Sequence, residues 1–206
     1  MQIALFIFDR MTALDAVGPL EIIGRLPGAD VRIVGKRKGP VRAGHLGLTV
    51  DHALKDVPAP DILLLPGAAD MTAVTADGEV LDWIRAADRT STWTTSVCTG
   101  ALLLGAAGLL EGKRATTHWS AMKQLAGYGA IPVAERVVTD GKFMTGAGVS
   151  AGIDMALTLL GEIAGADHAQ FVQLMTEYDP QPPYSAGSLA TAPEGVRARA
   201  EALFAS

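Results

Sequence analysis

Apolar residues in this chain form short runs separated by turn residues, a pattern typical of buried strands that alternate with helices. Residues 2–8 are nearly all apolar, and so are residues 61–65, which a Pro-Gly pair closes. Continuous apolar runs of this length predict strands covered on both faces. Residues 79–87 instead carry their apolar side chains at helical spacing and predict a helix.

The same criteria assign most of the remaining chain. A helix is expected to begin at Val17, with Pro19 in its first turn and a loop over residues 9–15 before it. The further strands expected lie at residues 31–34, 93–97 and 113–117, a hairpin is expected at residues 137–144, and residues 41–50 predict a small excursion with glycine-marked turns. The further helices are expected at residues 101–110, 118–125, 151–163, 166–176 and 193–204. This alternation predicts an α/β fold, a mostly parallel sheet with helices on both faces, formed by one domain spanning residues 1–206.

In such sheets ligands bind beyond the carboxyl ends of the strands. The residues that follow four of the predicted strands are Asp15, Gly67, Cys98 and the glycine-rich segment 146–150. We therefore expect these four loops to converge at one edge of the sheet.

Cys98 is the only cysteine, and it lies where a β-branched segment gives way to one rich in Ala, Leu and Gly. A sharp strand-to-helix turn directs free N–H groups of the helix at the turn residue. These amides and the helix dipole favour an anion, so the thiol is expected to have a lowered pKa and to act as a nucleophile. The alternative is that Cys98 is a small buried apolar residue.

A thiolate nucleophile needs a proton relay and a binding site for developing charge. Asp15 is the candidate acid, expected to have a raised pKa in a dry pocket, and the alternative is that it caps the following helix. Glu21 is either a second carboxylate near the site or a first-turn acid. The Thr99 amide is a candidate anion donor, with a second donor from Gly67 or Ala68.

His118 and Trp119 either line a pocket or belong to half-buried packing. The glycine-rich segment 146–148 either lets the backbone approach a ligand or only permits tight packing.

Composition narrows the function. The net charge of −5 is spread along the 206 residues without a basic stripe, which argues against nucleic acid as a partner. One cysteine excludes an intrachain disulfide and a cysteine-rich zinc site. We find no signal peptide and no apolar run that could span a membrane, so a soluble, cytoplasmic protein is expected.

Five segments carry motifs of a known family, and they span residues 14–19, 96–119, 129–138, 148–154 and 178–183. These motifs resemble the DJ-1/PfpI superfamily, and their combination is similar to its isocyanide (isonitrile) hydratases. The resemblance implies a flavodoxin-like fold, like that of class I glutamine amidotransferases, in a homodimer with neither metal nor organic cofactor. It also implies that Cys98 is the nucleophile, Asp15 its acid/base partner and Thr99 a polar neighbour.

The reaction implied by the resemblance adds water to a small-molecule isocyanide and gives an N-substituted formamide through a thioimidate on Cys98. Gly67, Ala68, Trp119 and Val149 are the expected substrate-binding residues. Protease-like members carry His directly after the nucleophile, and Thr99 at that position makes amide hydrolysis unlikely. The chain departs from its relatives at Ala68, where many have Gly, and at Val149, where a larger Ile is expected.

Two other functions use the same residues. Similar domains in transcription regulators bind a ligand without turning it over. A redox or stress sensor would oxidise Cys98 to a sulfenic or sulfinic acid.

Overall fold

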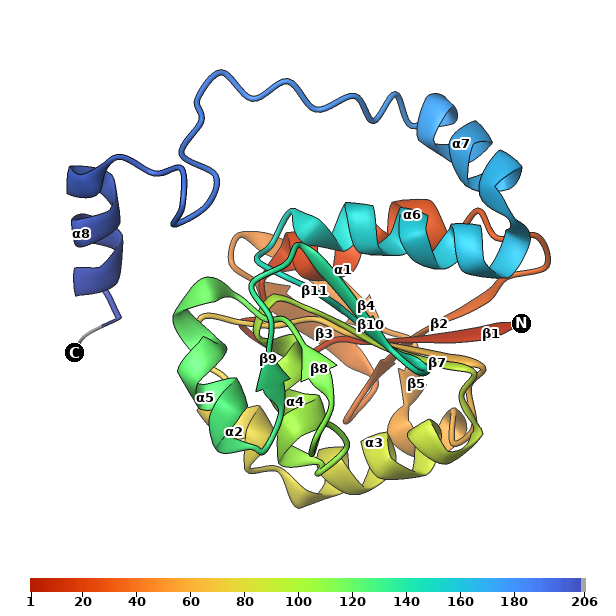
Figure 1. The fold of residues 1–206 in the computed structure, drawn as a ribbon. Helices are drawn as coiled ribbons and strands as arrows, with labels where there is room; N and C mark the ends of the chain where they lie inside the picture. The colour runs from red at the N-terminus through yellow and green to blue at the C-terminus, as the bar shows by residue number, and fades with distance from the viewer. Residues whose placement is uncertain (205–206) are drawn as a thin grey trace.

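A computed structural model describes residues 1–204 and has at its centre a seven-stranded sheet with the strand order β10-β11-β7-β6-β1-β2-β5 (Figure 1). Only the β10–β11 pair is antiparallel. The strands of this sheet are β1 (Gln2–Phe6), β2 (Asp30–Gly35), β5 (His52–Ala53), β6 (Ile62–Leu65), β7 (Trp93–Val97), β10 (Val137–Asp140) and β11 (Phe143–Gly146). The two small sheets pair β3 (Gly39–Ala43) with β4 (Leu46–Val50), and β8 (Arg114–Ala115) with β9 (Ile131–Pro132).

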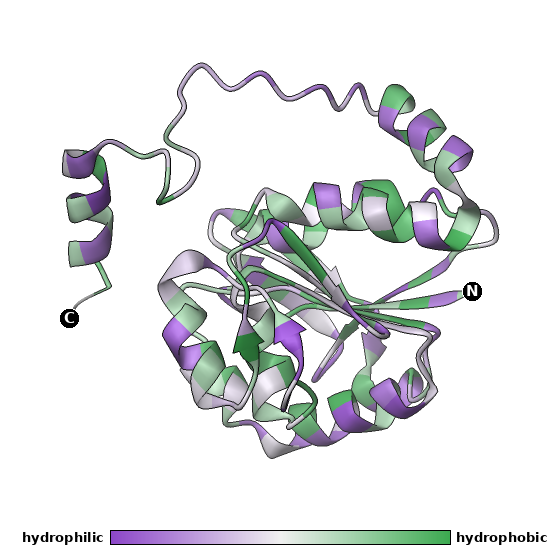
Figure 2. Cartoon of the chain, in the orientation of Figure 1, coloured by the Kyte–Doolittle hydropathy of each residue, from purple (hydrophilic) through white to green (hydrophobic). Residues whose placement is uncertain are grey.

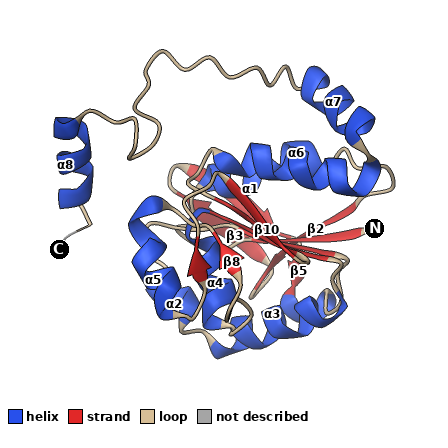
Figure 3. Ribbon diagram, in the orientation of Figure 1, coloured by secondary structure: helices blue, strands red, loops and turns tan. Residues whose placement is uncertain are grey.

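Helices cover both faces of the sheet (Figures 1 and 3). On one face lie α1 (Ala13–Ile23) and α6 (Ala151–Ala164), followed by α7 (Ala166–Met175). On the other lie α2 (Thr72–Thr75), α3 (Gly78–Thr90), α4 (Ala101–Ala106) and α5 (Met122–Gly127). Three short 3-10 turns complete this part of the chain: η1 (Leu54–Asp56), η2 (Cys98–Gly100) and η3 (Trp119–Ala121). The predicted α/β class and mostly parallel sheet are confirmed.

The side chains of the apolar runs fill the two layers between the sheet and the helices. Colouring by hydropathy shows hydrophobic residues along the strands (Figure 2). Along β1 the side chains alternate: Ile3 and Leu5 join the cluster under α1 and α6, whereas Ala4 and Phe6 join the cluster on the other side. A strand buried on both faces therefore contributes to both cores, which explains its continuous apolar sequence.

The start of α1 differs from the prediction. The helix begins at Ala13 rather than Val17, so Asp15 lies in its first turn and Pro19 lies inside it. Pro19 packs against Gly152 of α6, where a side chain on the glycine would meet the proline ring at 3.1 Å. Packing between α1 and α6 thus outweighs the usual preference of proline for the first turn.

The last part of the chain leaves the α/β body. Residues 179–204, called here the C-terminal arm, run from the end of α7 to α8 (Glu194–Ala202) on the far side of the molecule (Figures 1 and 3). No residue of the arm is buried, and α8 buries none of its side chains. The predicted helix near the end of the chain is confirmed, but it stands apart from the sheet.

Within residues 1–204, every helix is too short or too polar to cross a membrane.

Candidate active site

Cys98 lies directly after β7, at the centre of a sharp turn. Its backbone has φ of 58°, a left-handed conformation that a residue with a side chain adopts at a cost. Two contacts hold the turn: the Cys98 N–H donates to the Ala147 carbonyl at 2.8 Å, and the Thr117 hydroxyl donates to the Cys98 carbonyl at 2.8 Å. The strand-to-helix turn expected from the sequence is present, with η2 as the first turn before α4.

The sulfur of Cys98 is almost enclosed, with 5% of the residue exposed. The backbone N–H groups of Val149 and Thr99 lie beside the sulfur, and each lowers the pKa of the thiol. Val149 comes from the loop after β11 and Thr99 from the turn itself. The loop after β11 therefore converges on the Cys98 turn as expected, and the loop and the turn each place an amide that favours a negative sulfur.

Asp15 is fully buried beside the thiol. Its Oδ2 accepts the Gly67 N–H at 3.0 Å, and the Cys98 thiol lies close enough to lower the pKa of the carboxyl group. The other oxygen, Oδ1, has no hydrogen-bond partner among residues 1–204. Asp15 does not cap α1, because Thr12 holds the cap position and makes no side-chain cap bond. The carboxylate instead lies beside the Cys98 thiol.

Burial controls the proton affinity of both groups. It raises the pKa of Asp15 to about 7, opposed by the Gly67 and Cys98 hydrogen bonds. Burial, and after it the negative charge of Asp15, together raise the pKa of the Cys98 thiol to about 11. The expected raised pKa of Asp15 agrees with this result, but the expected lowered pKa of Cys98 is wrong, because two N–H donors do not offset desolvation and a neighbouring carboxylate. Between pH 7 and 11 the pair therefore shares one proton.

The Thr99 side chain connects the nucleophile turn to the loop after β6. Its Oγ1 accepts the Ala68 N–H at 2.9 Å and donates to the Ala68 carbonyl at 2.7 Å. The Gly67 N–H is bound to Asp15, so neither Gly67 nor Ala68 offers the second anion donor expected from the sequence. The structure provides the Val149 N–H instead.

The other candidate residues from the sequence are Glu21, His118 and Trp119. Glu21 is exposed and pairs with Arg25 at 3.6 Å, so it is not a second carboxylate of the site. His118 and Trp119 are half-buried and in contact, with ring centroids 5.2 Å apart. The His118 ring lies against Gly148, where a side chain would meet it at 2.8 Å. These two rings border the catalytic turn without a direct contact to Cys98 in the structure.

Three features of the site were not predicted from the sequence. They are the hydrogen bond from the Thr117 hydroxyl to the Cys98 carbonyl, the approach of the Val149 amide to the sulfur, and a polar network that reaches Ser150, the residue after Val149. In that network Asp154 accepts from Arg136 and from the Tyr178 hydroxyl, the latter at 3.0 Å. These three residues lie in three of the motifs that carry the resemblance, which was the available signal.

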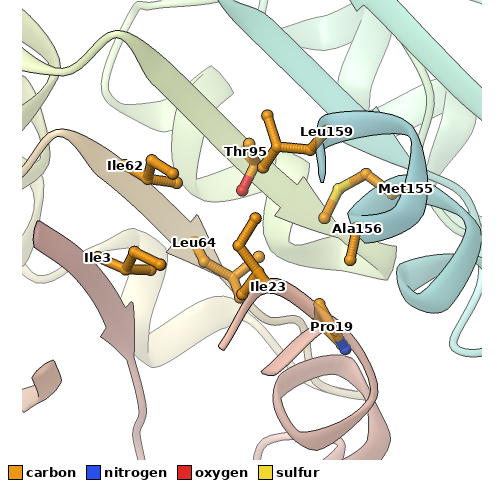
Figure 4. Close-up of a pocket in the computed structure, with 9 residues that line it drawn as sticks. All are labelled: Ile3, Pro19, Ile23, Ile62, Leu64, Thr95, Met155, Ala156 and Leu159. Carbon is orange, nitrogen blue, oxygen red and sulfur yellow. The ribbon is translucent and has the colours of Figure 1, made fainter. Parts of the chain in front are cut away.

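The apolar gap shown in Figure 4 is separate from this site. It lies between the sheet and helices α1 and α6, it does not include Cys98 or Asp15, and it is too narrow to hold a water molecule. Its side chains are those labelled in Figure 4: Ile3, Pro19, Ile23, Ile62, Leu64, Thr95, Met155, Ala156 and Leu159. We assign it to core packing.

Fold and site together define a class: α/β proteins with a cysteine on a strained turn at the sheet edge and a buried carboxylate beside it. The model of the DJ-1/PfpI family matches residues 1–162, and the chain belongs to that family.

Individual relatives extend the similarity over nearly the whole chain. The isonitrile hydratase of Pseudomonas putida is 46% identical over 197 residues, which is 95% of this chain and 86% of that protein. The crystal structure of a ThiJ/PfpI family protein from Pseudomonas syringae is 42% identical and superimposes with a TM-score of 0.96 over 99% of this chain and 86% of that one. The transcriptional regulator CdhR of Pseudomonas aeruginosa is 32% identical over 164 residues, 77% of this chain but 48% of its own length.

Proposed function

We propose that this protein is an isocyanide hydratase, which converts an organic isocyanide and water into an N-substituted formamide. The observation that carries the proposal is the contact between the Cys98 thiol and the buried Asp15 carboxylate. The 46% identity to the Pseudomonas putida isonitrile hydratase supports it over most of both chains.

The first step forms a thioimidate. The sulfur of Cys98 bonds to the terminal carbon of the isocyanide, while the thiol proton passes through Asp15 to the same carbon. The product is R–N=CH–S–Cys98, and no atom is lost. Asp15 suits this transfer because its pKa of about 7 lets it both take and release a proton near neutral pH.

The second step adds water to the thioimidate carbon. Asp15 accepts a proton from the water and passes it to the substrate nitrogen, giving a tetrahedral adduct. The C–S bond then breaks, the hydroxyl proton returns through Asp15 to sulfur, and the formamide leaves. The Thr99 and Val149 amides stabilise the departing thiolate.

Two observations weigh against the other functions. Thr99 binds Ala68 through its hydroxyl and has no acid/base group, so the site lacks the Cys–His pair of a protease. A redox sensor needs a thiol that an oxidant reaches readily, whereas Cys98 is only 5% exposed.

The test is turnover of an aryl isocyanide by the wild-type protein. We expect stoichiometric formamide and, after rapid acid quenching, a mass increase on Cys98 equal to one isocyanide. Blocking Cys98 with iodoacetamide beforehand serves as the control and should remove both signals. A wild-type protein that forms no formamide would refute the proposal.

We further propose that the enzyme works as a homodimer in the reducing cytoplasm, which suits a free thiol. The C-terminal arm supports the proposal of a dimer, because the stability of a nine-residue helix such as α8 is marginal in water unless the helix packs against another surface. A solved relative superimposes over 99% of the chain, so the path of the arm recurs there. A second copy of the chain would bury the exposed apolar side chain of α8, Val196.

The dimer is tested by light scattering. We expect the mass of two chains for the wild type and a weakened dimer for Val196→Asp, because Val196 is 48% exposed on α8 and free of strain in the single chain. Leu46→Asp, at a similarly exposed residue on β4 (44%), is the control and should remain dimeric. A monomeric wild type at tens of micromolar would contradict this prediction.

A further inference from the structure

Three aromatic rings from distant parts of the chain meet beside the catalytic turn. The Phe204 ring, at the end of the C-terminal arm, lies edge-on to Trp119 with centroids 5.2 Å apart and lies 5.9 Å from His118. The His118 and Trp119 rings are themselves in contact. We call these three residues the aromatic cluster.

The aromatic cluster adjoins the nucleophile by two independent connections. Thr117, the residue before His118, donates its hydroxyl to the Cys98 carbonyl. The His118 ring lies against Gly148, the residue before Val149, whose amide lies beside the Cys98 sulfur. The cluster therefore borders one segment that binds the Cys98 backbone and one segment that places an amide beside the Cys98 sulfur.

The chemistry of the cluster is that of an apolar aromatic surface. Phe204 is 52% exposed although it is the only arm side chain that stacks on the body within residues 1–204, so part of its ring is still open to a further contact. The His118 Nδ1 is bound to the Ser120 hydroxyl at 2.7 Å, and burial lowers the pKa of the ring. An uncharged imidazole beside two aromatic rings favours an apolar or aromatic group over a charged one.

We propose that the aromatic cluster binds the organic substituent of the isocyanide, so that the arm supplies Phe204 as a specificity-determining residue. This inference rests on the proposed function. A linear isocyanide attacked at its terminal carbon projects its substituent away from the sulfur, and the aromatic cluster is the apolar surface next to the residues that hold that sulfur. Aryl substituents stack on such rings, whereas a small alkyl group gains much less.

The test compares an aryl isocyanide with a small alkyl isocyanide. Phe204→Ala should raise KM for the aryl substrate about five- to tenfold, with kcat within about twofold, and should leave both constants for the alkyl substrate nearly unchanged. Phe204→Tyr should restore the wild-type KM. Leu203→Ala is the matched control, because Leu203 is the neighbouring residue, is 76% exposed and has no ring.

A role limited to fixing the arm predicts a different result. Equal effects of Phe204→Ala on both substrates, or effects no larger than those of Leu203→Ala, would overturn the inference. Because Phe204 is exposed, its replacement should not prevent folding, which circular dichroism checks.

A second readout separates this inference from the proposed function. The relative rates at which N-phenylmaleimide and N-methylmaleimide alkylate Cys98 report on the aromatic cluster without isocyanide turnover. We expect Phe204→Ala to lower the preference for the phenyl reagent several-fold. If the wild type hydrates no isocyanide, the proposed function fails, and an unchanged maleimide preference would then refute the aromatic cluster as well.

Discussion

Asp15→Asn should abolish hydration and at the same time stabilise the fold. Asn cannot carry the proton between sulfur and substrate, so we expect kcat to fall by about 10³-fold. Its side-chain oxygen can still accept the Gly67 N–H, so the loop contact is retained. Formamide formation measured at pH 8 gives the loss of activity.

The gain in stability follows from the pKa of Asp15. That pKa is about 7 in the fold and 3.8 in ordinary surroundings, so between these values the native protein holds a proton that the unfolded chain has released. The free energy of unfolding of the wild type therefore falls as the pH rises from 4 to 7, by on the order of 4 kcal/mol. Asn carries no charge and avoids this loss, so the variant should match the wild type near pH 4 and exceed it above pH 7.

Urea unfolding at pH 4 and pH 8 measures the difference, and the alkylation rate of Cys98 serves as a control on the site. Because the Asp15 charge raises the pKa of the thiol, Asp15→Asn should lower that pKa and speed alkylation at pH 9. Retained turnover would show that Asp15 has no role in proton transfer, and equal stability at pH 8 would show that its carboxylate is not desolvated.

Gly100→Ala should destabilise the protein severely. A Cβ at Gly100 would collide with the carbonyl oxygen of Leu65, at the end of β6, and would approach the Pro66 carbonyl carbon to 3.0 Å. Both contacted groups are backbone atoms at the end of the inner strand β6, and unlike a flexible side chain they cannot rotate away. We expect a loss of at least about 3 kcal/mol in the free energy of unfolding, with the nucleophile turn displaced.

Thermal and urea unfolding of Gly127→Ala provide the matched control. Gly127 ends α5, and a Cβ there would meet nothing within 4 Å, so alanine should be neutral or stabilising by up to about 1 kcal/mol. A Gly100→Ala protein as stable as this control would mean that η2 and β6 are not packed as closely as the structure has them.

Local patterns were sufficient for the parts of the site that depend on strand ends. Cys98 follows β7 and Gly67 follows β6, and parallel strands bring such residues to one edge whatever the details of packing. For this reason the convergence of the loops could be predicted from the sequence. Asp15 lies beside Cys98 as expected. Its place inside α1 was not expected, because the packing of Pro19 against Gly152, which accommodates the proline within the helix, is a tertiary contact.

Long-range partners could not be predicted from local patterns. Thr99 could bind a ligand or a neighbouring loop, and only the fold shows that Ala68 occupies its hydroxyl. The sign of the pKa change at Cys98 depends on burial and on Asp15, which outweigh the two amides that the sequence suggested. Phe204 is separated from Trp119 by most of the second half of the chain, and no periodicity connects them.

The loop after β6 influences the distance between Asp15 and Cys98. In the strand order, β6 lies between β7, which ends at Cys98, and β1, which leads to Asp15. The loop binds both flanks at once, since the Gly67 amide holds Asp15 and Ala68 holds Thr99. The length of this loop therefore contributes to the distance between Asp15 and Cys98. Lengthening the loop by a single residue would change that distance without altering either side chain.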